Sequence, residues 1–149
     1  MKPVSSLEKR LLAIIVDVIV LGAGGALLSH AAIADERGIV ASILGHFYFI
    51  LFHWLTGSTP GKYVARIQVV HSSTGARLSI AQAALRESPY VLLTLFDALQ
   101  GVGFDLWPSW IAWASLSFFA LDVIAAVADQ RNRSLHDRLA KTVVVLRNQ

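Results

Sequence analysis

Two aspartates lie within apolar stretches of the sequence that could cross a membrane. Asp17 follows Arg10 by seven residues, and Asp122 precedes Asp129 by seven residues. If both stretches are helices that reach the cytoplasmic surface, the two carboxylates lie at similar depth in the inner half of the bilayer. A carboxylate there is costly and commonly has a function. Two carboxylates that repel each other could hold and exchange a proton, so they suggest a cation or proton site.

The same aspartates could instead form only a polar clamp between helices, with each carboxylate satisfied by arginine and hydroxyl groups. Arg10 shares a helix face with Asp17, because seven residues are nearly two helical turns. His46 and His53 share a face for the same reason, and could relay protons or be one packing and one interfacial histidine. The candidate ion or proton site comprises Asp17, Asp122, Arg10, His46 and Asp97.

Four apolar stretches position these residues, and we expect helices at about 8–34, 38–56, 88–104 and 106–128. A helix of about 20 apolar residues spans the hydrocarbon core of a bilayer. The third stretch is the weakest, and it could be a tilted, short or re-entrant helix. An interfacial helix over 80–87 could precede it, with Pro89 kinking or dividing the two pieces.

The basic residues predict the topology. Of the thirteen Lys and Arg residues, all but Arg37 fall in three clusters, at 2–10, 62–86 and 131–147. Basic residues collect on the cytoplasmic side of membrane proteins. The pattern therefore predicts four crossings, with both termini, a loop at 57–87 and a tail at 129–149 in the cytoplasm, and with 35–37 and 101–105 outside.

The cytoplasmic segments contain two short runs that are typical of strands. Ile67–Val70 alternates in polarity, and Thr142–Leu146 is rich in β-branched residues. Since the rest of the chain is helical, we expect these two runs to pair with each other. Ser134 followed by Asp137 predicts a short capped helix through Ser134–Ala140.

Composition limits the function classes. The chain is 55% hydrophobic and 15% charged, whereas soluble domains have about 25% charged residues. Without cysteine it has neither disulfides nor a thiolate metal site, and we expect no metal or cofactor. The net charge of +3 suits anionic lipid headgroups better than nucleic acid. The sequence shows no nucleophile elbow, phosphate loop or zinc-ligand helix, so we do not expect an enzyme.

Several motifs follow one another in a recognisable order. Arg10 and then Asp17 in the first helix precede the segment Gly57-Ser-Thr-Pro-Gly-Lys62 and a Val-Val strand with a Ser/Thr/Gly turn. Leu78-Ser-Ile-Ala-Gln-Ala-Ala-Leu-Arg86 comes next, and the chain closes on Ser134-Leu-His-Asp-Arg-Leu-Ala140 and Thr142-Val-Val-Val145. Together they resemble the RDD family of small bacterial membrane proteins, from about Leu7 to Val145.

The resemblance assigns Arg10 and Asp17 as the Arg and first Asp for which the family is named, and favours Asp137 over Asp122 as the second Asp. The chain departs from the family pattern where Arg66 replaces a glycine before the first strand, with Gln68 in place of an arginine. Lys141 replaces a glycine before the second strand.

We therefore expect one domain over 1–149, an all-α membrane protein with a four-helix transmembrane bundle, both termini in the cytoplasm and a two-stranded β element. It would be a multi-pass protein of the cell (inner or plasma) membrane that contacts the bilayer and its anionic headgroups. Some family members are described as sodium/proton antiporters, so the resemblance implies transport of monovalent cations and protons by the chain or by a complex containing it. We expect such transport to need a homo-oligomer. The alternative is a scaffold or accessory subunit that binds other membrane proteins without transporting anything.

Overall fold

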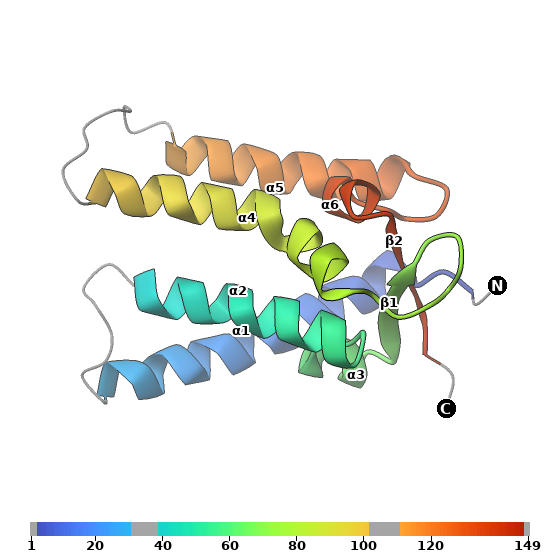
Figure 1. Ribbon diagram of the computed structural model, residues 1–149, viewed down its shortest axis with the longest axis horizontal. Coiled ribbons are helices and arrows are strands. Elements are labelled where there is room, and N and C mark those ends of the chain that lie inside the picture. Colours follow the sequence, from blue (N-terminus) through green and yellow to red (C-terminus); the bar gives the residue numbers. More distant parts are fainter. Residues whose placement is uncertain (1–2, 31–38, 102–110, 148–149) are drawn as a thin grey trace.

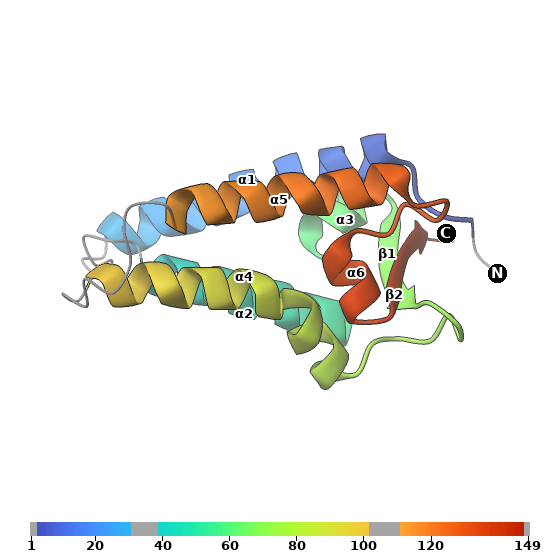
Figure 2. The same cartoon turned by 90° about the horizontal axis from the view of Figure 1, so that it is seen from above.

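The computed structural model describes residues 3–30, 39–101 and 111–147. Four long helices run side by side, and two short helices and a small sheet gather at one end, where both termini also lie (Figure 1; Figure 2). The predicted outer segments 35–37 and 101–105 lie outside the described residues, apart from Gly101. In chain order the elements are α1 Leu7–His30, α2 Ile39–Leu55, α3 Pro60–Val64, β1 Ile67–His71, α4 Ile80–Gly101, α5 Ile111–Ala128, α6 Leu135–Leu139 and β2 Thr142–Leu146.

One helix within the described residues is long and apolar enough to cross a membrane by itself, over Leu7–Leu27 of α1. Ile39–Leu55 and Trp113–Ala128 are apolar but shorter. The structure therefore confirms a mostly helical chain with one clear candidate span, and four crossings remain a prediction.

The third long helix begins earlier than the sequence predicted. We expected it to start at residue 88, but α4 is continuous from Ile80 and contains Pro89. Proline removes the N–H that would bond to the carbonyl of Leu85, and the Ser88 hydroxyl donates to that carbonyl instead, at 2.9 Å. The ribbon of α4 bends in its N-terminal part (Figure 1), as expected when proline interrupts the hydrogen-bond ladder. Pro89 thus bends the helix without dividing it.

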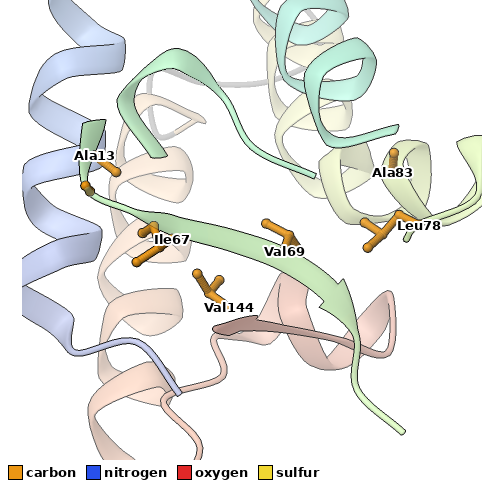
Figure 3. Close-up of a cluster of buried hydrophobic side chains, with 7 residues drawn as sticks. Ala13, Ile67, Val69, Leu78, Ala83 and Val144 are labelled. Atoms are coloured by element: carbon orange, nitrogen blue, oxygen red, sulfur yellow. The ribbon is translucent and has the colours of Figure 1, made fainter. Parts of the chain in front are cut away.

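The predicted strand pairing is confirmed. β1 and β2 form an antiparallel pair in which Val69 faces Val144. The N-terminal segment covers the other edge of β2, where the Ser5 N–H donates to the Val144 carbonyl at 3.0 Å and the Leu146 N–H to the Pro3 carbonyl at 2.9 Å. Buried apolar side chains from the sheet, α1, α4 and the segment before α4 pack together (Figure 3), among them Ala13, Ile67, Val69, Leu78, Ala83 and Val144.

The segments α3–β1 and α6–β2 repeat one local structure, with each position recurring 75 residues later. Thr59 and Ser134 are the N-caps, with φ of −71° and −72°, and each accepts a hydrogen bond from the backbone N–H three residues on. Ala65 and Ala140 are the C-caps. Arg66 and Lys141 follow with left-handed φ of 56° and 54°. The predicted short helix after Ser134 is confirmed, and α3 is its unpredicted counterpart.

The backbone hydrogen bonds repeat in the same way and cross between the two segments. The Ser72 N–H donates to the Lys141 carbonyl, and the Arg147 N–H donates to the Arg66 carbonyl, both at 2.9 Å. Because Val69 pairs with Val144, each of these valines faces the residue 75 positions away from itself. A local two-fold axis therefore passes between them and relates the two segments.

Candidate functional site

Asp137 is the centre of a buried ion cluster that joins three helices. Its carboxylate pairs with Arg10 of α1, where Nη1 lies 3.0 Å from Oδ2, and with Nη1 of Arg86 of α4. Asp137 is 0% exposed. It also accepts hydrogen bonds from the Ser134 N–H at 3.2 Å and the Thr142 hydroxyl at 3.2 Å. One carboxylate therefore caps α6 and ties it to both long helices.

The charges around Asp137 decide its protonation state. Burial alone would raise the pKa of this carboxyl group, but the neighbouring basic groups, with Arg86 first, then His136 and Arg10, hold its pKa far below the ordinary value. Asp137 is therefore ionised at neutral pH. A buried ion pair tolerates the removal of neither partner, because the other charge is then left without compensation.

Asp17 is bound entirely by neutral donors among the described residues. Its carboxylate accepts hydrogen bonds from the Tyr48 hydroxyl at 2.7 Å, the Thr59 hydroxyl at 2.5 Å and the Gly61 N–H at 2.8 Å. Gly61 must be glycine for this contact, since an added Cβ would lie 2.7 Å from Cγ of Asp17 and would overlap the Ala13 carbonyl. The contact holds α3 against α1 and reaches α2 through Tyr48.

Asp122 makes the corresponding contacts in the second half of the chain. It accepts hydrogen bonds from the His136 N–H at 3.1 Å and the Tyr90 hydroxyl at 3.1 Å, and the His136 ring Nδ1 lies 2.8 Å from it. Gly61 and His136 are the second residues of α3 and α6, so equivalent backbone amides bind the two carboxylates. The order of acid and tyrosine differs between the two halves of the chain. In the first half the aspartate, Asp17, is on α1 and its tyrosine is on α2. In the second half the tyrosine, Tyr90, is on α4 and the aspartate is on α5.

The predicted site residues are therefore divided among separate clusters. Within the described residues, no hydrogen bond or ion pair joins Asp17 to Asp122. Arg10 pairs with Asp137 and not with Asp17. The side chain of Asp97 lies outside the described part of the structure.

The fourth candidate, His46, lies in a different cluster between α2 and α4. Its Nδ1 is 3.0 Å from Oε1 of Glu87, and its Nε2 is 2.9 Å from the hydroxyl oxygen of Thr94. His53, on the same helix, is 3% exposed, and neither ring nitrogen has a hydrogen-bond partner among the described residues.

Sequence reasoning missed Glu87, and it offered Arg86 as a side chain that could approach Asp17 from a neighbouring helix, whereas Arg86 pairs with Asp137. Arg86 and Glu87 both precede Pro89, and the predicted third membrane helix began after them. The amphipathic pattern of the stretch 80–87 was a usable signal, since a helix continuing through Pro89 places both residues at the bundle. Tyr48, Tyr90 and Thr59 gave no comparable signal, because each contacts a carboxylate at least 31 residues away.

The described residues include one apolar helix long enough to cross a membrane, charges paired between helices, and small capped elements at one end, as the resemblance to a family of helical membrane proteins led us to expect. A family model agrees: the RDD family matches residues 4–141, and the chain belongs to this membrane family. Comparison with curated proteins and with solved structures gives no match.

The structure explains why the family pattern has glycine at two positions, 66 and 141 in this chain. The resemblance expects glycine where this chain has Arg66 and Lys141, and these residues adopt φ of 56° and 54°. That backbone region is open to glycine at no steric cost and disfavours residues with a Cβ. Arg66 and Lys141 thus keep the left-handed backbone of the turn although their Cβ atoms make it strained.

Proposed function

We propose that the protein exchanges a monovalent cation for a proton across the membrane, alone or as a subunit of a larger carrier. The observation that carries this proposal is the His46–Glu87 pair between the apolar helix α2 and α4, with Thr94 on the far side of the imidazole. Ionisable pairs inside membrane helices commonly belong to ion or proton pathways.

The chemistry of the pair suits a proton-for-cation exchange. With one proton shared between them, an imidazole and a carboxylate are together neutral. Loss of that proton leaves one negative charge, which a monovalent cation can balance. Histidine is the side chain whose charge most readily changes near neutral pH. Glu87 and Thr94 are seven residues apart on α4, so the single side chain of His46 contacts two positions whose backbones are about 10 Å apart along that helix.

The proposal includes the predicted topology and assembly. We keep the four predicted crossings in the cell membrane, with the sheet on the cytoplasmic side near anionic headgroups. Because α4 is continuous from Ile80, we move the start of the third crossing ahead of Glu87, so that the His46–Glu87 pair lies within the bilayer. A single bundle of this size seldom encloses a complete transport path, so we propose that copies of the chain assemble into a homo-oligomer.

Flux through proteoliposomes tests the proposal. The protein is reconstituted with a pH dye inside the vesicles, and sodium or potassium is added outside. We expect cation-dependent proton movement in the wild type, loss of it in Glu87→Gln, and no change in the control Glu8→Gln, since Glu8 is an exposed acid outside the cluster. Absence of flux in the wild type, or equal flux in Glu87→Gln, contradicts the proposal.

A second candidate function is a scaffold or accessory subunit that binds other membrane proteins without transporting ions. The hydrogen bonds of Asp17 and Asp122 favour it, because both carboxylates fix short helices and are occupied by protein donors. On this alternative, Asp17→Asn lowers the unfolding temperature and the wild-type protein shows no flux.

A further inference from the structure

Lys62 occupies the position in α3 that Asp137 occupies in α6. Each is the third residue of its short helix, and its backbone N–H donates to the hydroxyl of the N-cap, at 3.2 Å for Lys62 and 3.4 Å for Asp137. The backbones are equivalent, yet the side chains carry opposite charges. Lys62 therefore cannot cap its helix or gather arginines as Asp137 does.

The ammonium group of Lys62 has no hydrogen bond or ion pair to the described residues. It lies over the ring of Phe49, whose centroid is 5.8 Å from Nζ. The side chain is only half-buried, so water or a small ion can reach it. A charge held by an aromatic face rather than by a carboxylate is free to exchange its proton or its place with another cation.

The ammonium group of Lys62 lies beside the α2 face that carries the proposed transport pair, over the ring of Phe49. His46, Phe49 and His53 follow one another at spacings of three and four, so they share a face of α2. Phe49 stacks on the ring of His53, with centroids 6.2 Å apart. The polar groups on this face therefore extend from the His46–Glu87 pair toward the end of the molecule that holds the sheet.

Charged groups from every neighbouring long helix act on the amine. Burial, which has the largest effect, and the charge of Arg86 together lower the pKa of Lys62 to about 8, although the nearby carboxylates act in the opposite direction. The groups that face it are Asp17 of α1, His53 of α2, Arg86 and Glu87 of α4, and Asp137 of α6.

We propose that Lys62 is the charge gate of the cation path. This inference rests on the proposed function. While protonated, the ammonium occupies the place through which a monovalent cation would reach the His46–Glu87 pair. When Lys62 releases its proton to water at the sheet end, the cation can pass and take the place of the shared proton of the His46–Glu87 pair. Lys62 then takes a proton back, so that over the cycle one proton leaves for each cation that enters. The exchange is neutral in charge and needs no other reactant.

Two substitutions separate the two charge states of the gate. Lys62→Arg keeps a positive charge at every accessible pH, and Lys62→Gln removes it. In proteoliposomes we expect Lys62→Arg to lose both the proton movement read with the dye and the entry of radioactive sodium or potassium. Lys62→Gln should keep radioactive sodium or potassium entry without a dependence on pH near 8. Lys141→Gln, which changes an exposed lysine outside the bundle, should behave as wild type. Wild-type pH profiles in both Lys62 variants overturn the inference.

A binding measurement without a membrane keeps this test separate from the test of transport. Sodium or potassium chloride is added to weakly buffered, detergent-solubilised protein at pH 8, and proton release is read with a dye. Release in the wild type and in Lys141→Gln but not in Lys62→Arg supports the gate even if no flux is found, in which case only the proposed transport fails. No release from the wild type, or equal release from Lys62→Arg, overturns the gate.

Discussion

Arg10 and Asp137 are 127 residues apart in the chain, and their charged groups lie 3.0 Å apart in the structure. This ion pair connects the first helix to the last short helix, and Arg86 connects the middle of the chain to the same carboxylate. Three distant segments thus depend on one side chain for their arrangement.

Asp137→Asn should be strongly destabilising. It leaves Arg10 and Arg86 buried without a charge partner, and loss of one member of such a pair costs about 3–5 kcal/mol. The free energy of unfolding in detergent, followed by circular dichroism, measures the effect. Asp129→Asn is the control, since Asp129 pairs with the more exposed Arg133 and Arg138, and we expect a loss of about 1 kcal/mol or less. If both variants lose the same free energy of unfolding, the buried cluster around Asp137 stabilises the protein no more than an exposed ion pair does.

Gly61→Ala should displace α3 from α1. The new Cβ would overlap the Ala13 carbonyl and lie 2.7–2.8 Å from carboxylate atoms of Asp17. Overpacking of this kind costs about 1–3 kcal/mol. Gly45→Ala, in α2, meets nothing within 4 Å and should leave the unfolding temperature unchanged or raise it. A Gly61→Ala variant as stable as wild type would show that the α1–α3 contact can open without cost.

Lys141→Gly should stabilise the protein. Lys141 has φ of 54°, and relief of a left-handed backbone at a residue with a Cβ is worth about 1 kcal/mol. Lys141→Ala is the matched control, because it removes the same side chain but keeps the strained Cβ. We expect a higher unfolding temperature for glycine than for alanine, and the reverse order would contradict the strain argument. Arg66→Gly should behave in the same way.

Lys62→Met should change how stability depends on pH. The pKa of Lys62 is lowered from 10.5 to about 8 in the folded protein, so between these values the unfolded chain binds more protons. Stability of the wild type should therefore rise with pH over this range. Lys62→Met has no such group, so its unfolding temperature should be higher at pH 7 and should lack that rise. Thermal scans from pH 7 to pH 10 compare the two proteins.

A single cysteine at Ser73 should react only from the cytoplasmic side. Ser73 is exposed in the turn after β1, and the native chain contains no cysteine. In intact cells we expect no labelling of Ser73→Cys by an impermeant maleimide, and full labelling after the membrane is opened. Labelling of intact cells from outside would show that the turn after β1 is not in the cytoplasm and would contradict the predicted topology.

Local patterns predicted the parts of the fold that depend on near neighbours. The β-branched run after Lys141 and the run after Arg66 predicted the sheet, and Ser134 with Asp137 predicted a capped helix. Pro89 misled the prediction of the third helix, because nothing nearby in the sequence shows that Ser88 takes over the hydrogen bond to Leu85. The prediction correctly placed Arg10 at the start of the first helix, but its partner lies too far along the chain for spacing to reveal it.

The relation between the two halves was equally hidden from sequence reasoning. Thr59 and Ser134, or Ala65 and Ala140, match as residue types, but few neighbours match with them. What repeats is the backbone: the caps, the left-handed residue and the hydrogen bonds that end each strand. Many side chains are compatible with that backbone geometry, so the two segments share few residue types although their backbones are alike.

The two-fold axis between Val69 and Val144 has a genetic consequence. In a homodimer, each codon specifies two symmetric sites, so a mutation always changes both. Here one gene encodes both sites, and codons 62 and 137 can vary independently. A lysine at one and an aspartate at the other is an arrangement that no identical pair of subunits could inherit.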